Sequence, residues 1–144
     1  MRAIFVALIV NILIFSSASY ARNDINDYSV ADALNSAAAK GKLNDIQLFF
    51  GEQAYGKVLS KKGSVKVNKK TNAFNKTDTE ACEWVFLSAV IALQKTASKK
   101  GGNAVVNIKS NYKNNLTSSK DTFQCGAGSI IAGVALVGDI VTIK

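Results

Sequence analysis

One stretch, residues 77–112, constrains the fold of this chain more than any other. Thr77 stands three residues before Glu80, and this Thr-x-x-Glu spacing predicts a helix start at which each residue's side chain accepts the other's backbone N–H. Acidic residues follow in the first turns and lysines gather near the far end, as the helix dipole favours. The glycine pair at 101–102 predicts a left-handed stop. We therefore expect a helix over residues 78–100.

This helix is apolar on more than one side, and no polar face is clearly separated from the rest. One side carries Cys82, Val85, Phe86, Ala89 and Leu93, and another carries Trp84, Leu87 and Ile91. A soluble helix of this kind is buried on several sides. We expect it to pack on a sheet and to be covered also by the C-terminal segment or by a second subunit. Residues 104–108, Ala-Val-Val-Asn-Ile, predict a central strand directly after the glycines.

The N-terminus has the pattern of a signal peptide. Arg2 is followed by an apolar run, Ile4 to Phe15, and the small residues Ser19 and Ala21 stand where a signal peptidase reads. We expect cleavage after Ala21, which makes 1–21 a signal peptide and the mature chain periplasmic or secreted. The alternative is an uncleaved anchor, but the apolar run is short for a span of about 20 residues.

Charge is the second constraint. The 144-residue chain carries a formal net charge of +8, and the window 57–76 holds a run of lysines with no acid. The candidates for binding an anionic surface are Lys57, Lys61, Lys62, Lys66, Lys69 and Lys70, followed by Lys76. Anionic glycans, lipid head groups or acidic envelope proteins suit such a segment. Nucleic acid is not expected, because no aromatic residues interleave with the lysines. The alternative is a charged hairpin that only keeps the protein soluble.

The chain has two cysteines, Cys82 and Cys125, and no histidine. In an oxidising compartment two cysteines predict one disulfide. Closing so long a loop is worth roughly 4 kcal/mol in the chain-entropy description. The alternative is a redox-active thiol, but no Cys-x-x-Cys or histidine is present to lower a thiol pKa. The absence of histidine also argues against zinc sites and histidine-based catalysis.

Shorter elements are expected on either side of the main helix. Residues 22–29 are polar and are expected to be disordered, and 30–40 predicts a short helix stopped at a glycine. Residues 46–50 favour a strand. Residues 55–59 and 64–67 predict a basic hairpin around Lys-Lys-Gly. Beyond the central strand we expect an exposed polar loop over 113–121, a strand from 122 to 125, buried strands within 126–138, and a further strand over 140–143, after an interruption at Asp139.

One near-match to a nucleotide-binding motif fails. Residues 51–58, Gly-Glu-Gln-Ala-Tyr-Gly-Lys-Val, have the P-loop spacing, but Val58 stands where a Ser or Thr should hold magnesium. The following residues also predict strand rather than helix. Neither ATPase nor excinuclease activity is expected, and no cofactor or metal is assigned. The scattered acids, such as Glu80 and Glu83, are read as partners of the helix dipole rather than as a hydrolytic pair.

The chain resembles a family of small exported Gram-negative proteins whose members often carry the name "excinuclease ATPase subunit". The matching segments are Lys-Thr-Asn-Ala-Phe-Asn-Lys at 70–76, Glu-Ala-Cys-Glu-Trp at 80–84, Gly-Gly-Asn-Ala-Val-Val-Asn-Ile-Lys-Ser at 101–110 and Cys-Gly-Ala-Gly at 125–128. This resemblance covers most of residues 45–144.

A more distant resemblance is to the envelope-stress sensor RcsF and to YbjQ-like domains, through Asn103-Ala104-Val105-Val106 after a helix. It implies an α+β fold with one long central helix on a small mixed sheet, and a helix-to-C-terminus disulfide. The second RcsF disulfide and its lipid-attachment cysteine have no counterpart here. The YbjQ-like domains imply oligomers and a metal-binding role.

These observations predict an N-terminal polar segment with a short helix over 22–44 and an α+β domain over 45–144. The expected function is a non-enzymatic envelope module that binds or senses an anionic partner through the basic hairpin. The first alternative is a structural protein that self-assembles through the apolar helix and the Gly-rich C-terminus, and a metal-binding protein is the second.

Overall fold

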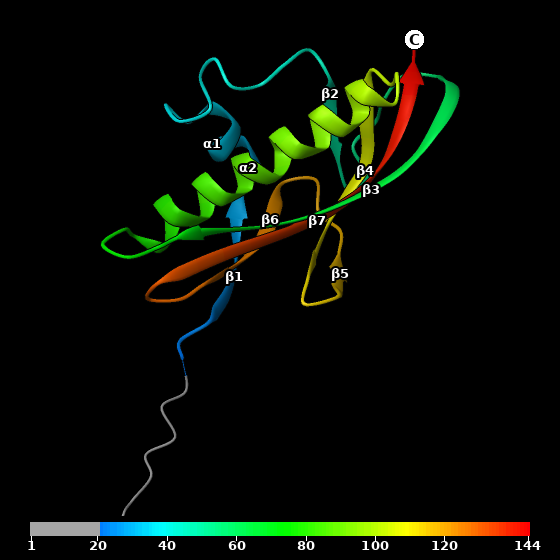
Figure 1. The fold of residues 1–144 in the computed structure, drawn as a ribbon. Helices are drawn as coiled ribbons and strands as arrows, with labels where there is room; N and C mark the ends of the chain where they lie inside the picture. Colours follow the sequence, from blue (N-terminus) through cyan, green and yellow to red (C-terminus); the bar gives the residue numbers. More distant parts are fainter. Residues whose placement is uncertain (1–20) are drawn as a thin grey trace, which may run out of the picture.

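The structure, a computed structural model, describes residues 21–144 as a mixed α+β domain with a seven-stranded sheet and one main helix (Figure 1). The predicted signal peptide lies outside the described residues except for Ala21. In chain order the elements are β1 (Asp24–Ser29), α1 (Val30–Asn35), β2 (Gln47–Phe50), β3 (Val58–Asn72), α2 (Asp78–Lys99), β4 (Ala104–Tyr112), β5 (Asn115–Thr117), β6 (Thr122–Ala127) and β7 (Ile131–Ile143).

The sheet is built around β7. One edge of β7 pairs antiparallel with β3 along its whole length. Its other edge pairs with β6 at its start and with β4 further along, both antiparallel. β1 continues the sheet beyond β6, while β2 lies parallel to β4 and β5 forms a hairpin with it. The sheet is therefore mixed, as predicted, and along one edge β7 changes its partner from β6 to β4.

Helix α2 lies across one face of this sheet (Figure 1). The Thr77 hydroxyl accepts the Glu80 amide at 3.1 Å, which confirms the predicted helix start. The reciprocal hydrogen bond, from the Thr77 amide to the Glu80 carboxylate, is not present among the described residues. Gly101 has a φ of +74°, which confirms the left-handed stop. The helix and the strand after it thus form as the residue pattern predicts.

The core lies between α2 and the sheet. Phe86 of α2 stacks on Phe123 of β6 with ring centroids 4.0 Å apart, and Phe50 of β2 packs against Phe86 at 5.8 Å. Leu93 and Ile140 are fully buried beside them. Burying side chains of this size is worth about 1.5–3 kcal/mol each.

A second layer over α2 comes from the chain before β2. Gln94 is 3% exposed, and its amide bonds the backbone of the α1–β2 connection. Its Oε1 accepts Asn44 N–H at 3.2 Å, while its Nε2 donates to the carbonyls of Asn44 and Ile46 at 3.3 and 2.8 Å. Lys42 lies over the Trp84 ring, 4.2 Å from its centroid. The C-terminal segment, which was expected to cover the helix, lies beneath it as β7 of the sheet. The additional cover comes instead from residues 30–46.

The predicted basic hairpin is wrong, because residues 58–72 form the single strand β3. Gly63, expected in a turn, adopts a φ of +103° within the strand, at a point where the register with β7 shifts. Such an irregularity bends a strand without reversing it. The thirteen residues of β7 offer a partner long enough to hold β3 extended across this bend.

Four other expectations need correction. Residues 24–29, expected to be disordered, pair with β6 as the edge strand β1. Val30 and Ala33 of α1, which spans only six residues, belong to the main core, so the segment 22–44 contributes to the same sheet and core. Asp139 does not interrupt the last strand; it projects as an exposed residue from the middle of β7. The expected loop over 113–121 contains the short strand β5.

Candidate functional site

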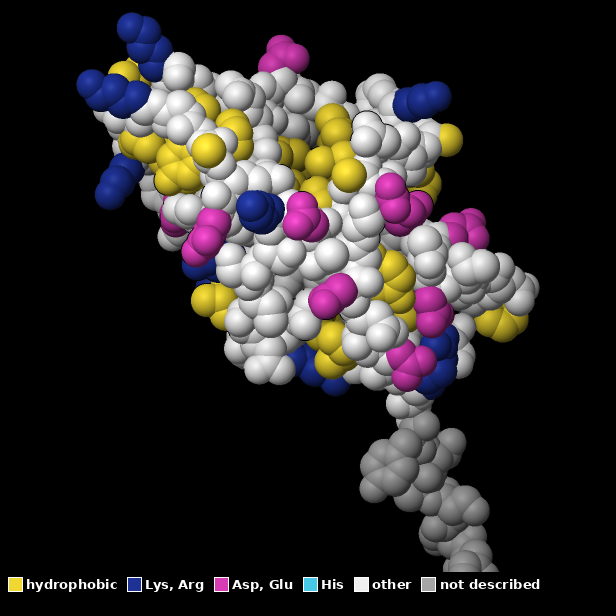
Figure 2. All heavy atoms as spheres, turned by 180° about the vertical axis from the view of Figure 1, so that it is seen from behind, with side chains coloured by type: hydrophobic (Ala, Val, Ile, Leu, Met, Phe, Trp, Pro, Cys, Tyr) yellow, Lys and Arg dark blue, Asp and Glu magenta, His cyan; other side chains and the backbone are white. Residues whose placement is uncertain are grey.

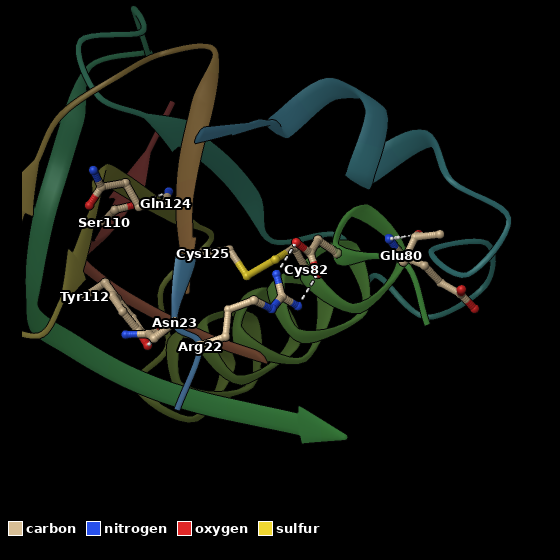
Figure 3. Close-up of a disulfide and its surroundings, with 10 residues drawn as sticks. Arg22, Asn23, Glu80, Cys82, Ser110, Tyr112, Gln124 and Cys125 are labelled. Atoms are coloured by element: carbon tan, nitrogen blue, oxygen red, sulfur yellow. Dashed lines mark hydrogen bonds and ion pairs between the residues drawn. A yellow bond between two sulfur atoms is a disulfide. The ribbon is translucent and has the colours of Figure 1, made fainter. Parts of the chain in front are cut away.

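The predicted disulfide is present and joins α2 to β6 through Cys82 and Cys125 (Figure 3). Both residues are fully buried in the main core, and their Cα atoms are 5.9 Å apart. No cysteine in the described part of the chain is free. A buried bond of this kind is inaccessible to a thiol partner, so the structure favours the structural reading over a redox role.

Close to this bond, Arg22 holds the start of the domain against α2 (Figure 3). Its guanidinium donates to both carboxylate oxygens of Asp78 at 2.9 Å and to Asp24 at 2.8 Å. The hydrogen bonds from Arg22 hold the pKa of Asp78 below its usual value. Tyr112 donates to Asn23 at 3.2 Å, which adds a second contact to the same segment.

The structure divides the predicted lysine cluster between the two faces of the sheet. Residues paired directly across two strands share a face. Lys61, Lys66 and Lys70 pair with residues of β7 on the face away from α2, which we call the open face. Lys69 pairs with Val134, a core residue beneath α2, and so lies on the helix-covered face. Lys62 falls at the irregularity of β3, and Lys57 precedes the strand.

The open face is hollowed by a shallow groove of about 720 Å³ between β3, β7 and β4. Lys66, Lys109 and Asp139 line it, with Asn107 and Asn111 beside them and Leu116 at its border. Asn107 interrupts the register between β4 and β7 and has a φ of +51°, and its amide donates to Asp139 at 3.1 Å. The groove therefore offers amides and lysine ammonium groups around one carboxylate, a lining suited to polar or anionic ligands.

Charge is unevenly distributed over the chain. Strand β3 carries Lys61, Lys62, Lys66, Lys69 and Lys70, all exposed, and no acid. Half of the ten acids precede Gln53 in the sequence: Asp24, Asp27, Asp32, Asp45 and Glu52. In the view of Figure 2, acidic side chains are spread over the surface while basic ones gather most densely at one upper corner. Attraction for anions is therefore local to the lysine-bearing strand rather than general to the surface.

A set of exposed apolar residues was missed by the sequence reasoning. Phe74, Ile130 and Ile131 are 61%, 65% and 53% exposed, although residues 126–138 were expected to be buried. The β3–β7 pairing brings these distant positions together, since Asn72 lies opposite Ile131. Residue types alone do not predict this meeting, because it depends on the register of two long strands.

The near-match to a nucleotide-binding motif also lacks the backbone of such a motif. The residues 51–58 lead into strand β3 and not into a helix, unlike a phosphate-binding P-loop. Within residues 21–144 there is no cluster of three metal-ligating side chains. None of the helices described in that range is long and apolar enough to cross a membrane. Comparisons of the chain with protein-family models, curated proteins and solved structures found no match.

Proposed function

We propose that this protein is an exported, non-enzymatic binding or sensing module of the cell envelope that engages anionic partners through β3. The observation that carries the proposal is the uninterrupted charge of that strand. Its five lysines are exposed and no acid stands between Val58 and Asn72. The ion pairs among the described residues both belong to Arg22, so the ammonium groups of β3 are not neutralised by neighbouring carboxylates.

The arrangement of the strand suits binding to an extended anionic partner. β3 is paired on one side only, so it forms an edge of the sheet. Its lysines lie between Lys61 and Lys70, a stretch that spans about 30 Å at the usual rise of a strand. Each lysine near an anionic surface contributes about 1 kcal/mol, and salt screens this attraction. A partner with many anionic groups can therefore bind tightly without a deep pocket.

Two features support placement in the envelope. The apolar N-terminal run followed by Ser19-Tyr20-Ala21 favours export to the periplasm and cleavage after Ala21. The disulfide between α2 and β6 suits an oxidising compartment. An RcsF-like fold is part of the proposal, because the long helix on a mixed sheet and the position of the disulfide agree with that resemblance.

Self-assembly through the apolar helix and the C-terminus has less support. The apolar residues of α2, such as Val85 and Leu93, are buried within the domain, and β7 lies between its partner strands. Most of the apolar surface that such an oligomer would use is therefore covered by the fold itself, and Trp84, Ile130 and Ile131 are its exposed remainder.

A charge-reversal experiment tests the proposal. We expect Lys61, Lys62, Lys69 and Lys70, all changed to Glu, to abolish binding to both immobilised dextran sulfate and vesicles containing phosphatidylglycerol. The matched control changes Lys40, Lys95, Lys99 and Lys120 to Glu, which alters the net charge equally at exposed sites outside β3. Equal loss in the two variants would show attraction by net charge alone, and unchanged binding in the β3 variant would remove the proposal.

A further inference from the structure

The exposed apolar residues noted above form one feature, which we call the apolar tip: Phe74, Ile130 and Ile131. The β3–α2 loop supplies Phe74, and the β6–β7 turn and the first residue of β7 supply the two isoleucines; these segments lie at the same end of the molecule in Figure 1. The Ala73 amide donates to the Ile130 carbonyl at 2.7 Å and joins the two directly. More than half of each side chain is exposed. Large apolar side chains gathered on a surface mark a binding site more often than single ones do.

The backbone holds Phe74 outward. Its amide donates to Asn72 Oδ1 at 2.8 Å, and the Lys76 amide donates to the Ala73 carbonyl at 3.1 Å. Asn75 completes the turn with a φ of +59°, a region that asparagine tolerates better than most residues. Because these bonds satisfy the short loop, Phe74 projects from a defined turn.

Lysines surround the apolar tip. Lys70 and Lys69 lie two and three residues before Asn72 on β3, and the Lys76 ammonium donates to the Asn72 carbonyl at 2.8 Å. The nearby acids Asp78 and Asp24 are engaged by Arg22, which leaves Glu80 as the remaining acid of the first turn of α2. The tip is therefore apolar at its end and positively charged just behind it.

The start of the domain lies against the same tip. The Arg22 carbonyl carbon and oxygen pack against Gly128 in the β6–β7 turn, where a side chain would meet that oxygen at 2.7 Å. The Gly128 amide in turn donates to the Ile131 carbonyl at 2.8 Å. The chain thus enters the domain beside Ile131, directly after the segment whose apolar sequence would meet a membrane during export.

From this geometry we infer that the apolar tip inserts into the interface of an anionic lipid bilayer, with Lys69, Lys70 and Lys76 against the head groups. The inference rests on the proposed function and names a membrane as the anionic partner. A soluble anionic glycan would use the lysines and leave Phe74, Ile130 and Ile131 in water. A bilayer takes up apolar side chains below its head groups and attracts lysines at its surface.

Vesicle binding by a tip variant is the first test. In Phe74→Ser/Ile130→Ser/Ile131→Ser we expect affinity for phosphatidylglycerol–phosphatidylcholine vesicles to fall by about 1,000-fold, since each of the three side chains loses about tenfold. The matched control is Ile25→Ser/Tyr55→Ser/Trp84→Ser, which removes three exposed apolar residues outside both β3 and the open-face groove. Thermal unfolding of both variants establishes that they are folded. Equal affinity of the tip variant and the unaltered protein would overturn the inference.

The two ends of β3 supply the second test. Lys69→Glu/Lys70→Glu lies beside the apolar tip, whereas Lys61→Glu/Lys62→Glu makes the same charge change at the other end of the strand. We expect the first pair to weaken vesicle binding at least about 25-fold, from about fivefold for each lysine, and the second pair to weaken it much less. Equal losses would mean that the strand lies flat on the membrane, which would overturn insertion by the tip.

Insertion depth can be read from fluorescence. In the Trp84→Phe background, which removes the only natural tryptophan, Phe74→Trp places one reporter at the tip. Brominated lipids should quench it on vesicle binding, and an unquenched reporter would overturn the inference.

If the tip variant keeps full vesicle binding while the four-lysine variant loses it, the tip proposal fails and the proposed function stands. If neither loses it, both fail. If the unaltered protein is a dimer, and the tip variant is a monomer that still binds vesicles, the tip contacts a second copy of the chain. That result would overturn the inference of membrane insertion.

Discussion

The two faces of the sheet differ in the interactions that stabilise them. The helix-covered face has a disulfide, stacked phenylalanines and a buried glutamine whose amide bonds a neighbouring loop. The open face has a small apolar cluster around Val106 and Val141, and beyond it a groove lined by lysine and asparagine side chains. One face thus supplies most of the stability, and the other is free to present charge. Substitutions that leave the fold intact should therefore be found mainly on the open face.

Removing the disulfide should have the largest effect and tests whether the helix-covered face dominates stability. We expect Cys82→Ala/Cys125→Ala to lower the free energy of unfolding by about 4 kcal/mol, because the unfolded chain regains the freedom of a long loop. Urea denaturation monitored by circular dichroism measures the change. The reduced unaltered protein is the control and should be destabilised similarly. A loss below about 1 kcal/mol would contradict the importance given to this bond.

On the open face, Gly126 is the position at which a substitution is expected to destabilise the protein as much as a substitution in the core. A side chain there would collide with the Tyr112 ring, which also lies near Gly133. We expect Gly126→Val to cost about 3 kcal/mol by overpacking. Combining it with Tyr112→Ala should recover part of this loss in a double-mutant cycle. If Gly126→Val alone unfolds like the unaltered protein, the contact between Tyr112 and the sheet is not important for stability.

Gln94 tests how much the buried hydrogen bonds of the helix-covered side contribute to stability. Gln94→Leu keeps the volume roughly constant but leaves the Asn44 amide and the carbonyls of Asn44 and Ile46 without their partner. We expect a loss of about 2 kcal/mol, typical of buried backbone groups left unsatisfied. Hydrogen exchange should show faster opening of residues 36–46. The exposed neighbour Lys95→Leu is the control, and equal stability of the two variants would contradict the assigned role.

The smallest effect is expected at the Arg22–Asp78 pair, which lies at the surface. The pKa of Asp78 is lowered by its hydrogen bonds with Arg22, so the pair stabilises the fold above the carboxyl's unfolded pKa. This contribution is lost as the pH falls through the lowered pKa. Because both side chains are well exposed, solvent screening keeps the effect small. The acid-induced loss should be slightly smaller in Asp78→Asn, and an identical pH profile would show that the pair contributes nothing.

The predictable parts of the fold are those specified by local patterns. The start of α2 follows from Thr77 and its end from Gly101, and the strand after it follows from a β-branched run. β1 was missed because it is a polar edge strand, and its apolar–polar alternation is too weak to indicate a strand. Gly63 was misread because a left-handed glycine fits a turn and a bent strand equally well.

The candidate site was predictable as a composition but not as a surface. The lysines of 57–76 are evident from the sequence, yet the face of each depends on its register with β7. The apolar tip was not predictable, because Phe74 and Ile130 are distant in sequence and meet only through the β3–β7 pairing. A run such as Ile130-Ile131 also looks like part of a buried strand, whereas Ile130 lies in the turn and Ile131 is the exposed first residue of β7.

The position of β7 has a consequence for how the protein is made. β7 follows all three of its partner strands in sequence, and its C-terminal half pairs with the first residues of β3. A chain that emerges from its N-terminus cannot complete the sheet before β7 arrives, and long-range pairing of this kind makes folding slow. The sheet should therefore close only after the last strand has been synthesised, and until then β3, β4 and β6 lack the strand that joins them.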